Sequence, residues 1–270
     1  MNNSMIDLIG NTPLIKLKYP SELTGCNIYG KAEFMNPGGS VKDRAALGII
    51  QDAEEKKLIE PGGTVVEGTF GNTGIALTMI NNARGYKTII VMPEAASLEK
   101  RDILRNLGAE LKIVEVKPYK DPGNYQHISR RLAEELQAKG EGSVIWANQF
   151  DNTANYEFHA KTTAREIYDQ LDGKIDGFTC AIGTGGTLAG ASVGLKELNP
   201  NIKIACTDPQ GATMYRYFKD SVLEVTGDPS ETEGIGQARV TKNVEACLID
   251  MAYHITDKDA FELLYKLIKT

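Results

Sequence analysis

Residues 178–198 read FTCAIGTGGTLAGASVGLKEL, and this stretch predicts the type of fold. Phe178 to Ile182 form a short apolar run, which is typical of a buried β-strand. Leu188 to Leu198 are mostly small or apolar and are followed by Asn199 and Pro200, so they predict a helix that ends there. The glycine-rich residues 183–187 form a loop between the two. A strand, a tight loop and a helix in this order are the building unit of parallel α/β folds.

Strand-like and helix-like segments alternate in the same way along most of the chain. Such alternation predicts parallel sheets with helices on both faces, and therefore an α/β fold. Apolar runs of strand length lie at 28–34, 64–67, 88–92, 111–116, 144–146 and 202–206, and helical patterns lie at 40–57, 73–84, 98–107, 124–139, 155–170 and 258–270.

The composition argues against several classes of protein. The chain has 270 residues and a net charge of −6, and it shows no basic patch that would indicate a nucleic-acid partner. No apolar stretch reaches the roughly 18 residues that a membrane helix needs. The four cysteines lack a CxxC spacing and the three histidines lie far apart, so we expect no metal site and a reducing, cytoplasmic setting.

Two loops offer clusters of backbone N–H groups. In the loop 183–187, Gly-Thr-Gly-Gly-Thr, glycines let the backbone approach a phosphate, and the dipole of the following helix favours negative charge. The second loop, Glu-Gly-Thr-Phe-Gly-Asn-Thr-Gly at 67–74, also lies between a predicted strand and a predicted helix. It adds an amide side chain to its backbone donors.

A lysine, Lys42, follows a third glycine-rich turn, Asn-Pro-Gly-Gly-Ser at 36–40, and begins a predicted helix. Burial and the helix N-terminus both disfavour a charged amine, and a partly neutral lysine can form a Schiff base with an aldehyde. Alone, the pattern fits a surface lysine at a helix start equally well. A reactive lysine together with a phosphate-binding loop suits a phosphorylated aldehyde, and pyridoxal 5'-phosphate is the obvious cofactor of that kind.

The order of these motifs resembles one enzyme family, the cysteine synthase (O-acetylserine sulfhydrylase) and cystathionine β-synthase family of pyridoxal-phosphate enzymes. The resemblance implies a two-domain, fold-type-II architecture like that of tryptophan synthase β, with parallel-rich twisted sheets flanked by helices. It also implies a larger cofactor-phosphate domain, 1–40 plus 144–270, and a smaller domain, 41–143, that carries the Lys42 helix and the Asn72 loop. The residues that carry the resemblance are 9–14, 36–44, 67–74, 148–150, 183–187 and 233–237.

The resemblance also implies which residues hold the cofactor. Lys42 would bind it covalently and later act as acid and base at the substrate Cα. Asn72 would form a hydrogen bond with the ring hydroxyl of the cofactor. The phosphate would be held by Gly183, Thr184, Gly185, Gly186 and Thr187.

The substrate carboxylate would be received by Thr69, Thr73 and Gln149, and Gly234 would lie on a loop that closes over the substrate. Read from the residues alone, Gln149 also fits a structural amide at a strand end, and Gly234 fits an ordinary turn.

The chain departs from the family pattern in two places. Phe70 stands where the family usually has a small residue. The family also continues beyond the position of Thr270, through a strand and a Ser-Ser-Gly-type segment whose serine binds the pyridine nitrogen. We therefore expect the C-terminal part of the fold to be missing from this chain.

The main functional hypothesis is a pyridoxal-phosphate-dependent β-replacement that makes L-cysteine from O-acetyl-L-serine and sulfide. Cystathionine β-synthase chemistry, with serine and homocysteine, is a close alternative. A different reading is a dinucleotide-binding domain, because Gly183-Thr-Gly follows a strand and Asp208 ends the next one. A third is a truncated pseudoenzyme that keeps only binding.

The resemblance implies a homodimer and a possible second ligand, the C-terminal tail of serine acetyltransferase. We expect small-molecule substrates and neither a nucleic-acid nor a membrane partner.

Overall fold

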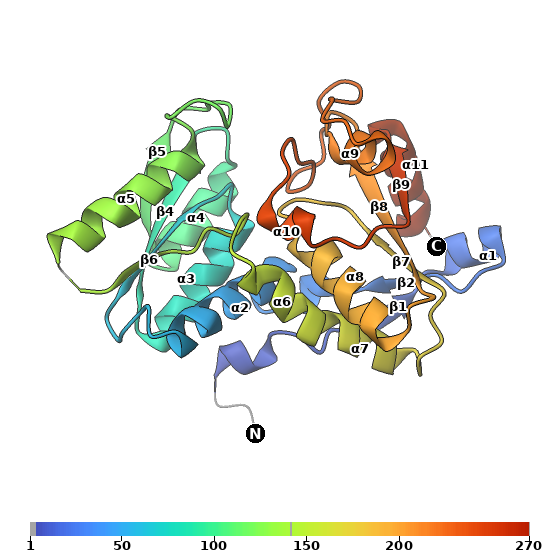
Figure 1. Cartoon of the computed structure of the whole chain (residues 1–270), viewed down its shortest axis with the longest axis horizontal. Helices are drawn as coiled ribbons and strands as arrows, with labels where there is room; N and C mark the ends of the chain where they lie inside the picture. The colour runs from blue at the N-terminus through green and yellow to red at the C-terminus, as the bar shows by residue number, and fades with distance from the viewer. Residues whose placement is uncertain (1–3, 141, 270) are drawn as a thin grey trace. The chain divides into compact units, whose positions relative to one another are not determined.

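The computed structural model describes residues 4–140 and 142–269, which form two compact units (Figure 1). The first unit comprises the described part of Met1–Ile9 together with Phe34–Asn155. The second comprises Gly10–Glu33 and the described part of Tyr156–Thr270. Residues 1–3, Glu141 of the expected domain junction and the chain end at Thr270 lie outside the described residues.

The boundaries of these units differ from the expected domain limits, 1–40 plus 144–270 and 41–143. The strand β6 (Val144–Trp146) pairs in parallel with β3 (Thr64–Gly68), with Val144 opposite Thr64. This pairing keeps the chain in the first unit as far as Asn155. The expected limit between 143 and 144 therefore falls within the first unit, and which domain serves the cofactor phosphate stays a prediction.

The first unit is built on a four-stranded parallel sheet in the order β5-β4-β3-β6. Its other strands are β4 (Lys87–Pro93) and β5 (Glu110–Val114). Its helices are α2 (Lys42–Glu55), α3 (Asn72–Arg84), α4 (Leu98–Asn106) and α5 (Tyr125–Lys139). The unit also contains the 3-10 turn η1 (Met5–Leu8), and a second such turn, η2 (Glu33–Met35), spans the limit between the units in the chain.

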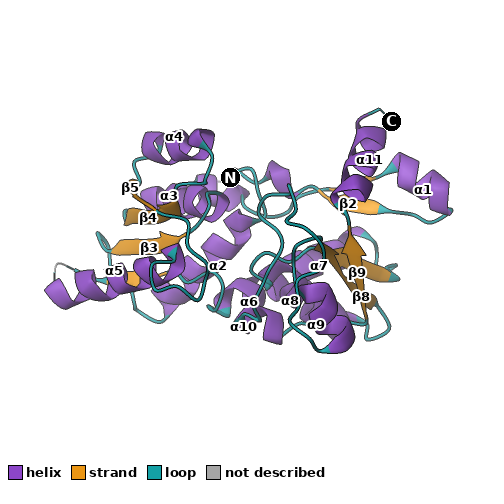
Figure 2. Cartoon of the chain, turned by 90° about the horizontal axis from the view of Figure 1, so that it is seen from above, coloured by secondary structure: helices purple, strands orange, loops and turns teal. Residues whose placement is uncertain are grey.

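Helices cover both faces of this sheet (Figures 1 and 2). Neighbouring residues of one strand point to opposite faces, and Ile89 and Ile90 of β4 accordingly belong to different clusters. Ile89 packs with Val66 and Ala133 of α5, whereas Ile90 packs with Leu104 of α4. Unbroken apolar strands are typical of a parallel sheet buried on both sides.

The second unit contains a three-stranded parallel sheet, β7-β8-β9, and an antiparallel pair, β1-β2. Its strands are β1 (Leu14–Lys16), β2 (Tyr29–Lys31), β7 (Gly177–Cys180), β8 (Lys203–Pro209) and β9 (Met251–Ile255). Its helices are α1 (Lys18–Thr24), α6 (Ala154–Lys161), which begins at the limit of the first unit, α7 (Thr163–Gln170), α8 (Gly186–Leu198), α9 (Met214–Asp220), α10 (Lys242–Glu245) and α11 (Asp257–Ile268). None of the helices described in either unit is long and apolar enough to cross a membrane.

Two expected elements differ in the structure. The run 28–34 is not one strand of a parallel sheet, because its residues 29–31 pair antiparallel with β1 and the chain then enters η2. The single helix expected at 155–170 is divided into α6 and α7 at Thr162. The hydroxyl of Thr162 donates to the carbonyl of Phe158 at 2.7 Å, and such back-bonding often bends helices.

Helix α8 lies close to α6 and α7 because two of its residues lack a side chain. A Cβ atom at Gly190 would collide with Tyr156 and His159, and one at Gly194 would lie 2.6 Å from the Cβ atom of Ala164. The apolar side of α8, with Leu188 among its residues, belongs to the main core of this unit.

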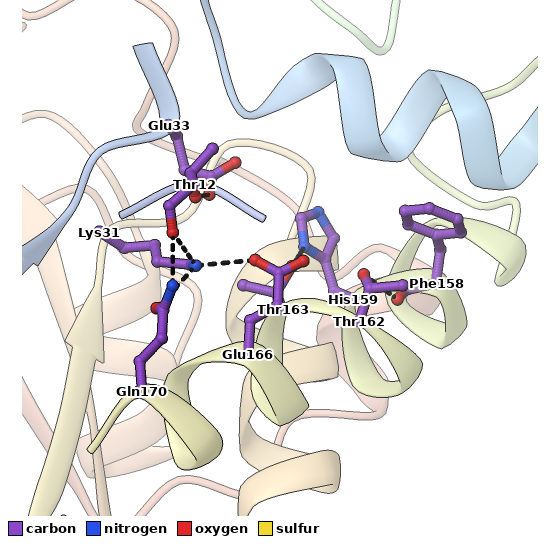
Figure 3. A network of polar contacts seen from close by, with 9 residues as sticks. All are labelled: Thr12, Lys31, Glu33, Phe158, His159, Thr162, Thr163, Glu166 and Gln170. Atoms are coloured by element: carbon purple, nitrogen blue, oxygen red, sulfur yellow. Dashed lines mark hydrogen bonds and ion pairs between the residues drawn. The ribbon is translucent and has the colours of Figure 1, made fainter. Parts of the chain in front are cut away.

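A buried ion pair joins the N-terminal strands of this unit to α7 (Figure 3). The Nζ atom of Lys31 lies 2.7 Å from Glu166 Oε2, and only 9% and 14% of the two side chains are exposed. Lys31 also donates to the carbonyl of Thr12 and to Gln170, whose Nε2 donates to the same carbonyl at 2.9 Å. The network fixes residues 10–33 to a helix that lies over 130 residues later in the chain.

We predict that Glu166→Ala lowers the free energy of unfolding by about 3 kcal/mol, because it leaves a buried ammonium group without its carboxylate. A matched control is Asp52→Ala, which removes the ion pair with Lys56 at 2.8 Å, where 61% of the lysine side chain is exposed. That change should cost less than about 1 kcal/mol. Urea unfolding of both variants measures the difference, and equal losses would contradict the prediction.

Candidate functional site

Lys42 is the first residue of α2, as expected, and a tight loop holds it there. The amide of Asn36 donates to the carbonyl of Ser40 at 3.2 Å, and the N–H of Gly38 donates to Asp43 Oδ2 at 2.5 Å. A Cβ atom at Gly38 would lie 2.5 Å from the other oxygen of Asp43, so the position requires glycine. The N–H of Lys42 itself donates to the hydroxyl of Ser40 at 3.2 Å. The loop thus presents a half-buried lysine at a helix N-terminus.

The second loop joins β3 to α3 and carries Thr69 and Asn72. The hydroxyl of Thr69, which is buried, accepts the N–H of Gly71 at 3.1 Å. Gly71 has a φ angle of 151° and lies against Lys100, where a Cβ atom would collide with that side chain. Asn72 begins α3 and its half-buried amide forms no hydrogen bond with another described residue. The amide is therefore available to a ligand.

Phe70 is accommodated in this loop by an aromatic contact. Its ring packs edge-to-face on Tyr125 of α5, with the ring centres 5.4 Å apart. The contact gives the larger side chain a partner within the same unit.

Thr73 and Gln149, expected to bind the same carboxylate, meet at the carboxyl edge of the sheet. The hydroxyl of Thr73 donates to Gln149 Oε1 at 2.5 Å, and both residues are buried. Gln149 follows β6 and Thr73 follows β3, so the parallel pairing of these strands brings the two together. The carbonyl of Gln149 accepts from the amide of Asn155 at 2.9 Å, which fixes its backbone.

Glu67 is a third member of this cluster that the sequence analysis did not assign to the site. Gln149 Nε2 donates to Glu67 Oε1 at 3.2 Å, and the N–H of Gln149 donates to Oε2 at 3.4 Å. Only 1% of Glu67 is exposed. Burial raises the pKa of Glu67 to about 8, although hydrogen bonds from Gln149, Asn148 and Gly68 act in the opposite direction. The carboxyl group is therefore mostly protonated at neutral pH.

In the second unit, residues 183–187 form the expected loop at the N-terminus of α8. The first helical hydrogen bond runs from Ala189 to Gly185, so the N–H groups of Gly186, Thr187 and Leu188 precede the hydrogen-bonded helix. Gly185 has a φ angle of 95°, and a Cβ atom there would lie 2.7 Å from Val244. The aligned N–H groups and the helix dipole favour an anion at this end of α8.

The segment that carries Gly234 is bound to the same loop. The N–H of Gly236 donates to the carbonyl of Ile182 at 2.8 Å, and the amide of Gln237 donates to that of Gly183 at 2.9 Å. A Cβ atom at Gly183 would lie 2.6 Å from the carbonyl of Gly234. The structure thus places Gly234 beside the glycine loop.

His159, which the sequence analysis assigned to no site, is buried next to the glycine loop. Its Nδ1 lies 2.8 Å from the hydroxyl of Thr163, and its Nε2 lies 3.4 Å from that of Thr187. Its imidazole therefore fixes the threonine that ends the loop. A lone histidine in a helix gave no signal of this contact in the sequence.

Asp208, which the dinucleotide reading requires for a ribose, is engaged elsewhere. It is buried in β8, and its Oδ2 accepts the N–H of Tyr215 in α9 at 2.8 Å. This carboxylate fixes the start of a helix and gives no support to the dinucleotide reading.

Comparisons with known proteins agree with the motif order. The sequence profile of the family described as "Pyridoxal-phosphate dependent enzyme" matches residues 5–270. "Cysteine synthase 1" of Neurospora crassa is 50% identical over 96% of this chain and 69% of its own length. "Cysteine synthase 1" of Emericella nidulans is 48% identical over 98% of this chain and 72% of its own length.

A solved structure extends the similarity to the fold. The O-acetylserine-dependent cystathionine beta-synthase from Helicobacter pylori is 33% identical, with a TM-score of 0.83. The alignment covers 100% of this chain and 84% of that structure. The agreement with the family fold therefore extends over the whole of the chain.

Glu67 gives the stability of the first unit a distinct pH dependence. Between pH 4.5 and about 8 the unfolded chain ionises this carboxyl while the folded chain keeps its proton, so the free energy of unfolding falls as the pH rises. We predict that, between pH 5 and pH 8, the free energy of unfolding of Glu67→Gln rises by about 3 kcal/mol relative to that of the unmodified chain. Urea unfolding at both pH values measures this gain, with the exposed Glu55→Gln as control. Parallel pH curves for the chain and its Glu67 variant would contradict it.

Proposed function

This chain belongs to the family of pyridoxal-phosphate-dependent enzymes, and from that premise we propose that it is a cysteine synthase. It would convert O-acetyl-L-serine and sulfide into L-cysteine and acetate by β-replacement. The observation that carries the proposal is a lysine held at a helix start, Lys42, in a chain matched by the family profile over residues 5–270. Two relatives named cysteine synthase, 48% and 50% identical, support the choice of reaction.

The donor sets of both units fit the cofactor. Thr187 and Leu188 offer backbone N–H groups at the start of a 13-residue helix, and the N–H of Gly186 donates to the hydroxyl of Thr184 on the same loop at 3.3 Å. This is the chemistry that a phosphate monoester requires. The first unit offers the amine of Lys42 and the amide of Asn72, which suit an aldehyde and a ring hydroxyl.

In the proposed reaction each group of the chain has one task. Lys42 would hold the cofactor aldehyde, and its amine would take the proton from the substrate Cα. Thr69, Thr73 and Gln149 orient the substrate carboxylate, and Gly234 lies on the segment that excludes water. Bound pyridoxal phosphate supplies the electron sink that lets acetate leave the β-carbon.

Cystathionine β-synthase chemistry remains the second candidate because one structural relative carries that name. The Helicobacter pylori relative is described as O-acetylserine-dependent. A shared donor substrate with a larger thiol acceptor would need no change in the residues that bind the carboxylate. Comparing sulfide with homocysteine as acceptor separates the two reactions.

The proposal includes the setting of the enzyme. We place it in the cytoplasm as a homodimer, with the C-terminal tail of serine acetyltransferase as a possible regulatory ligand. All four cysteines are free thiols, which suits a reducing compartment. Burial raises the pKa of Cys247 to about 12, so this thiol is not reactive at neutral pH.

We predict that Lys42→Ala abolishes cysteine formation and removes the cofactor-dependent visible absorbance of the purified chain. The variant loses the only amine that the proposal places on the cofactor. Lys56→Ala, at the C-cap of the same helix and exposed, is the matched control and should keep both properties. Retention of the visible absorbance in Lys42→Ala would assign the cofactor to another lysine.

We predict that O-acetylserine gives a higher kcat/KM with sulfide than O-phosphoserine or serine does. Arginine is the side chain best suited to clamp a phosphate dianion, and Arg239 is the one candidate near the Gly234 segment. Steady-state kinetics with the three donors tests the order. A preference for O-phosphoserine that is lost in Arg239→Ala would overturn it.

A further inference from the structure

The buried carboxyl group of Glu67 has no task in the proposed reaction, yet it touches a residue that does. It lies near the end of β3 with 1% exposed and binds both the amide and the backbone N–H of Gln149. Burying a carboxyl group is costly, and most of that cost is absent in a glutamine of the same shape. A buried carboxyl group at the edge of the candidate site therefore suggests a role in function.

Glu67 and the Gly68 carbonyl together receive the amide N–H groups of Gln149. Oε1 of Gln149 accepts from Thr73 at 2.5 Å, whereas Nε2 donates to Glu67 at 3.2 Å and lies 3.4 Å from the carbonyl of Gly68. A flipped amide would place Oε1 against the Gly68 carbonyl, which can only accept, whereas the Thr73 hydroxyl and a protonated Glu67 can each donate or accept. The three side chains thus form a chain of bonds with one direction, from Thr73 through Gln149 to Glu67.

The charge of Glu67 matters because the ligand proposed for Thr73 and Gln149 is itself an anion. An uncharged carboxyl group orients the amide without repelling a substrate carboxylate. An ionised one would hold the amide N–H groups more strongly and would place a second negative charge in a buried, low-dielectric cluster. Two carboxylates that share one site disfavour each other's ionised form.

We propose that Glu67 is a positioning residue for the substrate carboxylate: uncharged, it orients Gln149 and Thr73 for binding, and its ionisation weakens substrate binding. The inference rests on the proposed function in assigning Thr73 and Gln149 to an amino-acid carboxylate. Two titratable side chains from other elements lie near the residues that follow Glu67: Tyr125 of α5 lies against Gly68, and Lys100 of α4 lies against Gly71. The groups that form hydrogen bonds with Glu67 are uncharged amides and N–H groups.

The test compares the unmodified holoenzyme with Glu67→Gln, which keeps the shape and removes the ionisation. KM for O-acetylserine is measured for both enzymes from pH 7 to pH 9. The KM of the unmodified enzyme is divided by that of the variant, and this ratio cancels the titration of the substrate amine. The ratio should rise about tenfold over this range, because Glu67 titrates near pH 8 in the free enzyme. The kcat values of the two enzymes should show the same dependence on pH. Glu60→Gln, an exposed carboxyl in the same unit, should give a ratio independent of pH.

A constant KM ratio for Glu67→Gln would overturn the proposal, as would a change confined to kcat. If the variant does not fold, isotope-edited infrared spectroscopy of the unmodified enzyme decides instead. It should show the C=O stretch of a protonated, buried glutamate at pH 7 that disappears above pH 8. Absence of this band at pH 7 would overturn the proposal.

A binding measurement separates this inference from the proposed function. Calorimetry with L-serine as the probe measures carboxylate binding without turnover, and its Kd ratio between the two enzymes should show the same rise with pH. A chain that forms no cysteine at any pH but shows this rise would contradict the proposed reaction and support the role of Glu67. A chain that makes cysteine but whose Kd ratio does not change with pH would support the proposed reaction and contradict the role of Glu67.

Discussion

The parallel pairing of β3 with β6 is the constraint on which the first unit depends. The carboxyl ends of parallel strands meet at one edge of a sheet, so Glu67 and Gln149, 82 residues apart in the chain, come within hydrogen-bond distance. Thr73 joins them because α3 begins directly after the loop that follows β3. Without this pairing the loops at 67–74 and 148–150 would have no common edge.

Glycine serves a second, more local constraint in both units. At Gly38 a side chain would displace the Asp43 carboxyl group that closes the loop before Lys42. At Gly183 and Gly185 it would displace the Gly234 segment and Val244. In each case the missing Cβ lets another part of the chain approach the backbone. This close approach fixes the conformation of the loop and the direction of its N–H groups.

Local patterns predicted the elements well because they depend on neighbouring residues. The strand Val144–Trp146 and the glycine loop before α8 follow from apolar periodicity and turn residues, and the helices expected at 40–57 and 73–84 begin within two residues of those limits, at Lys42 and Asn72. The membership of β6 in the first unit did not follow, because strand pairing is a long-range property. The break at Thr162 depends on one side-chain hydrogen bond, which periodicity does not register.

The sequence predicted that the candidate site residues lie on loops at strand and helix ends, but not the contacts that support them. Thr73 and Gln149 were expected to serve one ligand, and the structure joins them directly. Glu67 and His159 were not assigned because their contacts form only in the folded chain. Glu67 accepts a hydrogen bond from Gln149, and His159 lies within hydrogen-bond distance of Thr187. Polar residues that support a site resemble ordinary core residues until their partners are known.

The central claim is that Lys42 binds the cofactor covalently, and borohydride reduction of the loaded chain tests it most directly. Reduction fixes the cofactor to its lysine, and proteolysis with mass spectrometry then locates the added mass. We expect a single modified peptide that contains Lys42. Modification of a different lysine, or none after reduction of a chain saturated with pyridoxal phosphate, would contradict it.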